Sequence, residues 1–224
     1  MRKIILLNII LFFVGCSSFK SSKVHSPDGS LVVEVKSDNG IISYSVFKNS
    51  KSIIENSKLG IISDKFEFSD DLVIKNIKRN YVRDVWSQVW GEQKKINDYY
   101  NQLTVTVSPK NNNHEMMIHF RLFDDGLGFR YEIPEQSEID NFNILDELTQ
   151  FNFSEDSQSW WIPAYAYRRY EFLYANTLIS EINRDKFSEL VEYLNGPRIG
   201  PEAVQTPFTV QREDGITIAI HEAN

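Results

Sequence analysis

Aromatic side chains with carboxylates nearby gather in two segments of this chain, around residues 86–92 and 160–171. Sugar rings expose faces of C–H groups that stack on indole and phenol rings, so such clusters suit a saccharide-binding surface. Large aromatic side chains also fill the cores of β-sandwiches, and that alternative stays open for each of them. Because neighbours in a strand point to opposite faces, Trp160 and Trp161 cannot both face one core. The aromatic candidates are Trp86, Trp90, Trp160, Trp161, Tyr165, Tyr167 and Tyr170, with the acids Glu92 and Glu171 close to them in sequence.

Motifs for self-sufficient catalysis are missing from the sequence. Glycoside hydrolysis needs two carboxyl groups that flank one bond, and none of the 31 acidic residues pairs with another by motif. The sequence contains no Gly-x-Ser-x-Gly elbow and no His-x-x-x-His zinc helix. His221 and Glu222 are adjacent, which could suit a metal or acid–base site, but in a strand they would point to opposite faces. We interpret this pair as part of a domain interface.

The N-terminus has the features of a bacterial export signal. Arg2 and Lys3 precede an eleven-residue apolar run, residues 4–14, which is too short to span a bilayer. Gly15-Cys16 resembles the end of a lipobox, and Cys16 is the only cysteine of the chain. We therefore predict a signal peptide over residues 1–15, lipidation of Cys16 and a place in the periplasm or outer membrane, with simple secretion as the alternative. Residues 16–23 are predicted to form a polar tether.

The charge of the chain excludes one class of partner. The formal net charge is −7, and loss of Arg2 and Lys3 with the signal peptide would take it to about −9. Lysine and arginine occur only in short clusters, whereas phosphate binding needs many of them on one surface. We expect no nucleic acid partner.

The rest of the sequence predicts an all-β protein with a single domain over residues 24–224. Residues 119–134 (HFRLFDDGLGFRYEIP) give the clearest signal, because two alternating runs flank an Asp-Asp-Gly turn. Short strands separated by Gly, Asn, Asp and Pro indicate an antiparallel β-sandwich. The predicted strands cover residues 31–36, 41–47, 72–78, 102–107, 115–123, 127–133, 149–153, 208–212 and 216–220.

One segment has a helical period. Phe187, Leu190, Val191 and Leu194 follow the i, i+3, i+4, i+7 pattern, with Asn183 as a cap before them and Gly196 as a stop after them. We predict one short structural helix of about three turns here.

Six motifs in a fixed order together resemble the N-terminal domain of glycoside hydrolase family 97, the α-glucosidase and α-galactosidase family. The resemblance covers nearly all of the chain after about residue 24. Gln88 and Tyr99 depart from it, because family members commonly have proline and histidine at these positions. The motifs are residues 25–29 (HSPDG), 89–92 (VWGE), 119–134, 161–163 (WIP), 170–172 (YEF) and 214–223 (DGITIAIHEA).

The resemblance implies a large β-sandwich of the super-sandwich type, followed in the family by a catalytic (β/α)8 barrel. Such a barrel needs roughly 250 residues of alternating strands and helices, and this chain shows no such pattern. The run of residues 216–224 reads as a strand without a turn or cap, so we expect the C-terminal edge to be truncated. The chain is then not catalytic as it stands, and its parent enzyme is an exo-acting α-glycosidase of polysaccharide utilisation.

The resemblance also implies functional residues. Glu171 matches a glutamate that reaches from the N-terminal domain to a calcium ion in the active site, and carboxylate oxygens are ligands that Ca²⁺ prefers. One carboxylate satisfies only part of the coordination shell, so the other ligands would come from the barrel. The residues expected to contact an α-linked oligosaccharide are Trp90, Glu92, Trp160, Trp161 and Tyr170.

Three hypotheses for function follow from the sequence. In the first, the chain is an N-terminal domain that lines one wall of a family 97 active site and is inert without a barrel, supplied in cis or as a split product. In the second, it is an independent lipoprotein that binds saccharide without cleaving it. The third is a β-sandwich that binds a partner other than sugar.

Overall fold

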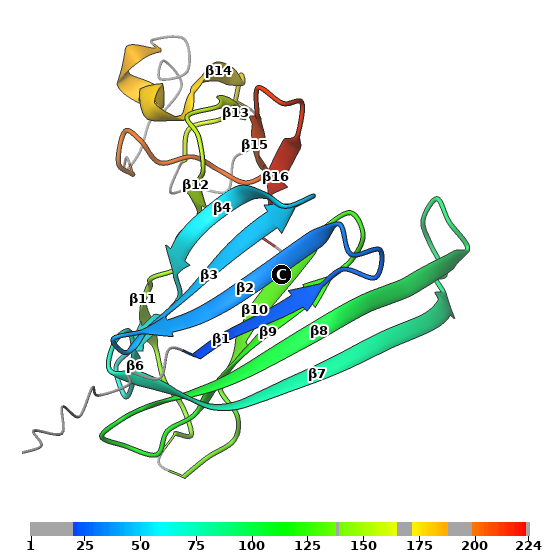
Figure 1. Ribbon diagram of the computed structural model, residues 1–224. Coiled ribbons are helices and arrows are strands. Elements are labelled where there is room, and N and C mark those ends of the chain that lie inside the picture. The colour runs from blue at the N-terminus through cyan, green and yellow to red at the C-terminus, as the bar shows by residue number, and fades with distance from the viewer. Residues whose placement is uncertain (1–19, 138, 165–171, 188–198, 223–224) are drawn as a thin grey trace, which may run out of the picture. The chain divides into compact units, whose positions relative to one another are not determined.

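The computed structural model describes residues 20–137, 139–164, 172–187 and 199–222 (Figure 1). The chain forms two compact units, Met1–Asn152 and Phe153–Asn224. The region predicted as one domain, residues 24–224, includes parts of both units. The described residues are almost entirely β-structure, which confirms the predicted fold class. No helix in this part of the chain is long and apolar enough to cross a membrane.

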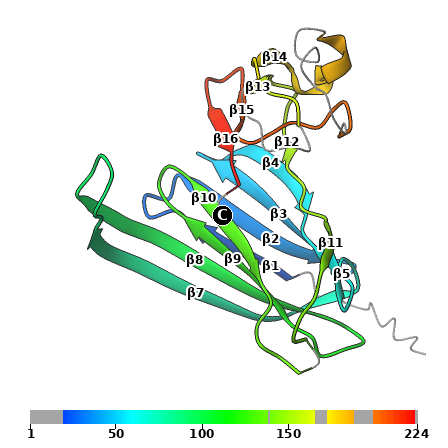
Figure 2. The ribbon, with the colours of Figure 1, turned by 180° about the vertical axis from the view of Figure 1, so that it is seen from behind.

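The first unit is an antiparallel sandwich. One sheet has the order β1-β2-β3-β4-β12, a second has the order β10-β9-β8-β7, and a third, smaller sheet has the order β11-β5-β6 (Figures 1 and 2). Its strands are β1 (Lys20–His25), β2 (Leu31–Asp38), β3 (Ile41–Lys48), β4 (Lys51–Lys58), β5 (Ile61–Ser63), β6 (Glu67–Phe68), β7 (Leu72–Ser87), β8 (Lys95–Pro109), β9 (Met116–Leu122), β10 (Leu127–Glu132), β11 (Ile144–Glu147) and β12 (Asn152–Phe153).

The core of this sandwich forms where the inward residues of the first two sheets meet. Tyr44 of β3 packs on Phe120 of β9 and on Phe129 of β10, with ring centroids 6.0 and 5.9 Å apart. The predicted hairpin supplies both phenylalanines. Its turn closes through a hydrogen bond from the Phe123 amide to the Gly126 carbonyl, 2.9 Å long. The period-2 alternation of residues 119–134 is therefore the pattern that builds this core.

The first strand, β1, is not predicted from the sequence, whose first expected strand begins at residue 31. Residues 20–23, which their polar composition assigned to the tether, form the first part of β1 and pair with β2. Ser22 and Val24 both lie inward and are buried, and the Arg79 guanidinium donates to Ser22 Oγ over 2.6 Å. A small hydroxyl side chain can occupy an inward position when it has a hydrogen-bond partner, and composition alone does not reveal that partner.

The second unit is a small sheet with its own core. The sheet has the order β14-β13-β15-β16, formed by β13 (Gln158–Trp161), β14 (Ala175–Leu178), β15 (Phe208–Gln211) and β16 (Thr217–Ile220). Two short 3-10 turns, η1 (Ile179–Glu181) and η2 (Arg184–Lys186), follow β14. Asn183 accepts a hydrogen bond from the Asp185 amide, but it caps the 3-10 turn η2, which ends before Phe187, and not the predicted three-turn helix. Most of the predicted helix, residues 188–194, lies outside the described residues.

Candidate functional site

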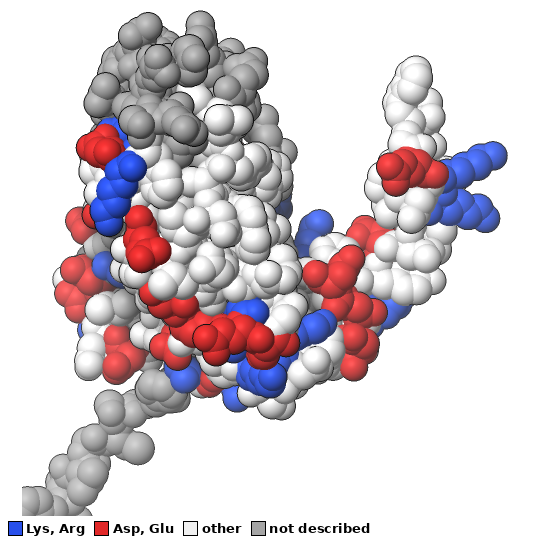
Figure 3. Space-filling model, turned by 90° about the horizontal axis from the view of Figure 1, so that it is seen from above, with Lys and Arg blue, Asp and Glu red and all other residues white. Residues whose placement is uncertain are grey.

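The strands β7 and β8 extend as a two-stranded ribbon beyond the sheet that they begin in. β9 pairs with β8 only over residues 101–107, whereas residues 81–87 of β7 pair with residues 95–101 of β8. The outer half of the ribbon projects away from the rest of the first unit (Figures 1 and 3). A ribbon without a covering layer is only marginally stable in water. Exposed aromatic and aliphatic side chains on such a ribbon are therefore candidates for contact with a ligand or another domain.

The tip of this ribbon carries two of the predicted binding residues. Trp90 is 86% exposed, its neighbour Val89 is 88% exposed, and Glu92 is also exposed. Trp86 lies at the end of β7 with about half of its surface accessible. A saccharide ring can stack on an indole that is held in this way, because one face of the ring system is open to solvent.

Gln88 holds the tip closed. Its backbone amide donates to the Lys94 carbonyl over 3.2 Å, and its side-chain amide donates to the Gln93 carbonyl over 2.6 Å. Proline at this position would have no amide hydrogen to make the first of these bonds.

The root of the ribbon brings together motifs that are far apart in sequence. Asn101 of β8 donates from Nδ2 to the His25 carbonyl over 2.7 Å and accepts at Oδ1 from Arg83 over 2.9 Å. The Asp28 amide donates to Asp124 Oδ1 over 2.8 Å, which joins the HSPDG loop to the turn of the hairpin. Hydrogen bonds from Ser26, then from Ser30, hold the pKa of Asp28 well below its usual range. Sequence reasoning missed this corner, because no local pattern reports contacts across 76 to 96 positions.

His119 occupies a polar position on the outward face of β9. Its Nδ1 lies 3.0 Å from Thr104 Oγ1, and its Nε2 lies 3.1 Å from Glu132 Oε2. Burial lowers the pKa of His119, and the Glu132 carboxylate opposes that shift. Arg130 also binds Glu132, with 2.8 Å between Nη2 and Oε2. The arrangement favours a neutral imidazole that acts as a structural group.

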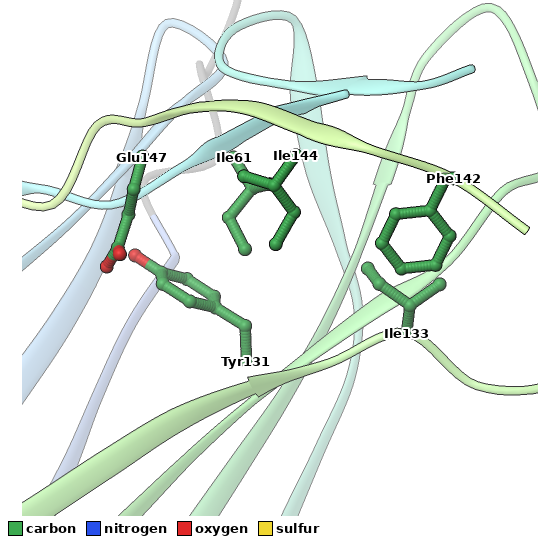
Figure 4. Close-up of a pocket in the computed structure, with 6 residues that line it drawn as sticks. All are labelled: Ile61, Tyr131, Ile133, Phe142, Ile144 and Glu147. Atoms are coloured by element: carbon green, nitrogen blue, oxygen red, sulfur yellow. The ribbon is translucent and has the colours of Figure 1, made fainter. Parts of the chain in front are cut away.

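A separate hollow of about 350 Å³ opens between β10 and β11 (Figure 4). Tyr131 and Glu147 lie at one end of it (Figure 4), and their polar atoms are linked through Thr149. Tyr131 Oη lies 2.7 Å from Thr149 Oγ1, which donates to Glu147 Oε1 over 2.7 Å. Burial raises the pKa of Tyr131 to about 12, so its hydroxyl stays protonated. The hollow is lined by Ile61, Tyr131, Ile133, Phe142, Ile144 and Glu147.

In the second unit, the prediction that Trp161 contacts sugar disagrees with its position in the structure. Trp161 is 0% exposed, its Nε1 donates to Thr177 Oγ1 over 3.0 Å, and its ring meets Phe187 edge to face. The indole therefore forms the core of this unit with Ala175, Phe208 and Val210, where no sugar can reach it. Trp160 points the other way and is partly exposed, which agrees with the expected alternation along the strand. The predicted interface residues His221 and Glu222 are both exposed.

The predicted calcium ligand, Glu171, and its neighbour Tyr170 lie outside the described residues, as do Tyr165, Tyr167 and the lipidation residue Cys16. Within the described ranges, no group of three or more His, Cys, Asp or Glu side chains is arranged to hold a metal ion. The structure thus leaves Trp90, Glu92 and Trp160 as the accessible members of the predicted binding set.

Comparison with known proteins decides the family. A profile of the glycosyl-hydrolase 97 N-terminal domain matches residues 24–224. The chain belongs to glycoside hydrolase family 97. A family 97 enzyme from Pseudoalteromonas sp. strain K8, solved as a glutamate-to-glutamine variant with panose, is 33% identical and superposes with a TM-score of 0.75. The alignment covers 91% of this chain and 28% of that enzyme.

Two further solved structures are similar to this chain. The same Pseudoalteromonas enzyme in complex with acarbose is also 33% identical, with a TM-score of 0.75 and the same coverage of 91% and 28%. A β-arabinopyranosidase is 21% identical, with a TM-score of 0.72 over 85% of this chain and 29% of that one, and shares the fold. This family 97 chain therefore spans less than a third of the length of the enzymes that it matches.

Proposed function

We propose that this chain is the non-catalytic N-terminal wall of a family 97 glycoside hydrolase, and that its parent enzyme is an exo-acting α-glycosidase. The observation that carries the proposal is the match over residues 24–224, which covers only 28% of a related enzyme found with panose and with acarbose. In this account the acid and base carboxylates belong to a catalytic (β/α)8 barrel. The N-terminal unit presents side chains to the α-linked oligosaccharide that the barrel cleaves.

Within that wall, Trp90 and Glu92 at the ribbon tip are the residues best placed to contact sugar, and Trp160 and Tyr170 are further candidates. Trp90 supports this role because it lies in a turn that a Gln88–Gln93 hydrogen bond closes and because its ring is exposed. Glu171 would add one carboxylate to a calcium ion whose other oxygen ligands come from the barrel, since Ca²⁺ takes about 6 to 8 of them. Calcium would polarise or orient the bound sugar. Cys16 would anchor the protein to the bacterial cell envelope.

A second candidate is a free-standing saccharide-binding lipoprotein. The exposure of Trp86 and Trp90 on one projecting ribbon favours it, because exposed indoles can stack on a sugar without a second domain. The two proposals differ in whether the chain alone binds sugar.

The experiment uses a fusion protein in which residues 20–224 of this chain, which include all of β1, replace the matched part of the Pseudoalteromonas enzyme, in the glutamine variant found with panose. We expect Trp90→Ala in the fusion protein to raise the Kd for panose about tenfold, which corresponds to a loss of roughly 1.4 kcal/mol in binding free energy. Val89→Ala, at the same tip and equally exposed, is the matched control and should leave the Kd unchanged. Glu171→Gln should weaken calcium binding, measured by titration with Ca²⁺ alone. Equal panose affinity in the unaltered fusion protein and in its Trp90→Ala and Val89→Ala variants would exclude the ribbon tip from the binding wall.

A further inference from the structure

Two strands that flank the hollow each have one free edge. Among the described residues, β10 pairs only with β9, and β11 pairs only with β5. A free strand edge presents unpaired N–H and C=O groups, which proteins usually cover, shorten or protect with charge. β11 is short and carries Asp146 and Glu147, but its first two residues are exposed aliphatic side chains, Ile144 at 58% and Leu145 at 66% exposure.

The register of the hairpin identifies the backbone groups at the free edge of β10. The bond from Phe123 to Gly126 makes these two residues a hydrogen-bonded pair, so the pairs Leu122–Leu127, Phe120–Phe129 and Ile118–Tyr131 are of the non-hydrogen-bonded kind. The N–H and C=O groups of Leu127, Phe129 and Tyr131 consequently point away from β9. Their side chains lie on the core side of β10, and the C-terminal part of this edge borders the hollow, because Tyr131 and Ile133 line it.

The hollow itself fits apolar side chains better than a polar ligand. Four of its six lining residues are Ile61, Ile133, Phe142 and Ile144. The polar atoms at its end already satisfy one another, since Tyr131 Oη also accepts a hydrogen bond from the Gly60 amide over 3.2 Å. Small-molecule sites have a few convergent polar groups that are free to fix a ligand. This hollow has an apolar lining and an adjacent strand edge, which together match the way a β-strand adds to a sheet.

We propose that an extended polypeptide strand with apolar side chains at alternate positions pairs with β10 and fills this hollow. The strand comes from the part of a family 97 enzyme that this chain does not match. In the Pseudoalteromonas enzyme, the alignment covers 28% of the chain, so this part is about 72% of it. The inference rests on the proposed function, because it needs the rest of such an enzyme to be present. Pairing would give hydrogen-bond partners to the backbone N–H and C=O groups of Leu127, Phe129 and Tyr131, and it would bury the side chain of Ile144.

Hydrogen exchange measures this pairing residue by residue. In the 224-residue chain alone, the amides of Leu127, Phe129 and Tyr131 should exchange quickly, whereas those of Arg130 and Glu132, which bond to β9, should exchange slowly. In the fusion protein all five should be slow, with the first three slowed about tenfold or more. If the fusion protein is insoluble, the same measurement is made on the chain mixed with the separately produced remainder of the Pseudoalteromonas enzyme.

A pair of variants tests the hollow. Ile144→Lys in the fusion protein should return the three edge amides to fast exchange, because a charge at the rim opposes burial of an apolar strand. Ile41→Lys, another half-exposed isoleucine at the start of β3, should not. Slow exchange at the three amides in the chain alone, or fast exchange in a fusion protein that binds panose, overturns the inference. Edge protection in a fusion protein that fails to bind panose would instead contradict the proposed function and leave the inference standing.

Discussion

Residues of the same type have opposite roles in this chain according to what surrounds them. Trp161 donates its indole N–H to Thr177 and packs in the core of the second unit, whereas Trp90 makes no contact of that kind and lies on a ribbon tip. The sequence predicts that Trp160 and Trp161 point to opposite faces. Which of them faces inward depends on β14 and β15, whose positions no local pattern reveals.

Because the two tryptophans differ in burial, their replacement by alanine should change the free energy of unfolding by different amounts. Trp161→Ala should lower the free energy of unfolding by about 3–5 kcal/mol, because it leaves a cavity in a small core. Trp90→Ala should change it by less than about 0.5 kcal/mol, as surface substitutions usually do. Urea denaturation of the two variants checks this. A large loss of stability for Trp90→Ala would show that the ribbon tip has a structural role.

His119 gives a pH dependence with a defined sign. Its pKa is lowered in the folded protein, so the unfolded chain binds a proton more readily as the pH falls below the ordinary value of 6.5. The groups facing the imidazole are Thr104, Glu132, Arg130 and Arg121. The free energy of unfolding should therefore fall between about pH 7.5 and 5.5, and His119→Gln should reduce that fall. His221→Gln, at an exposed position, controls for loss of a histidine, and an equal effect of both variants would contradict the role of His119.

At the scale of elements, the sequence predicts strands well where apolar and polar residues alternate, and it misses the exposed ribbon and some strands with a buried side, such as β4 and β13. The hairpin β9–β10 was predicted nearly to its ends, because Phe120, Leu122 and Phe129 alternate with polar residues. β7 and β8 continue nine and seven residues beyond the predicted segments along the ribbon, where no core imposes alternation. β1 was missed for a related reason, since serine occupies its buried position at Ser22.

The close approach of β5 and β6 predicts the effect of one glycine. A Cβ added at Gly60 would lie 2.6 Å from the Phe68 carbonyl oxygen, which is backbone and cannot rotate away. Gly60→Ala should lower the free energy of unfolding by about 1–3 kcal/mol, as overpacking does. Gly128→Ala in β10, where a Cβ would meet nothing within 4 Å, is the matched control and should be neutral or slightly stabilising. Equal urea midpoints for the two variants would contradict the close packing at Gly60.

At the scale of the whole molecule, the chain has the fold of a family 97 N-terminal domain but spans less than a third of the related enzymes. The sequence predicts the family, because six motifs keep their order along the chain. It does not predict the corner where the HSPDG loop, the hairpin turn and the root of the ribbon meet. That corner depends on contacts between Asp28 and Asp124 and between His25 and Asn101, which only the folded backbone creates.

The central claim is that this chain contributes to sugar binding only together with the rest of a family 97 enzyme. Calorimetric titration of panose into the chain alone and into the fusion protein, both with Ca²⁺, tests it most directly. The account predicts saturable binding by the fusion protein and none by the chain alone, whose folding is first checked by circular dichroism. Saturable binding by the chain alone that is lost on Trp90→Ala would contradict it and establish a free-standing saccharide-binding protein.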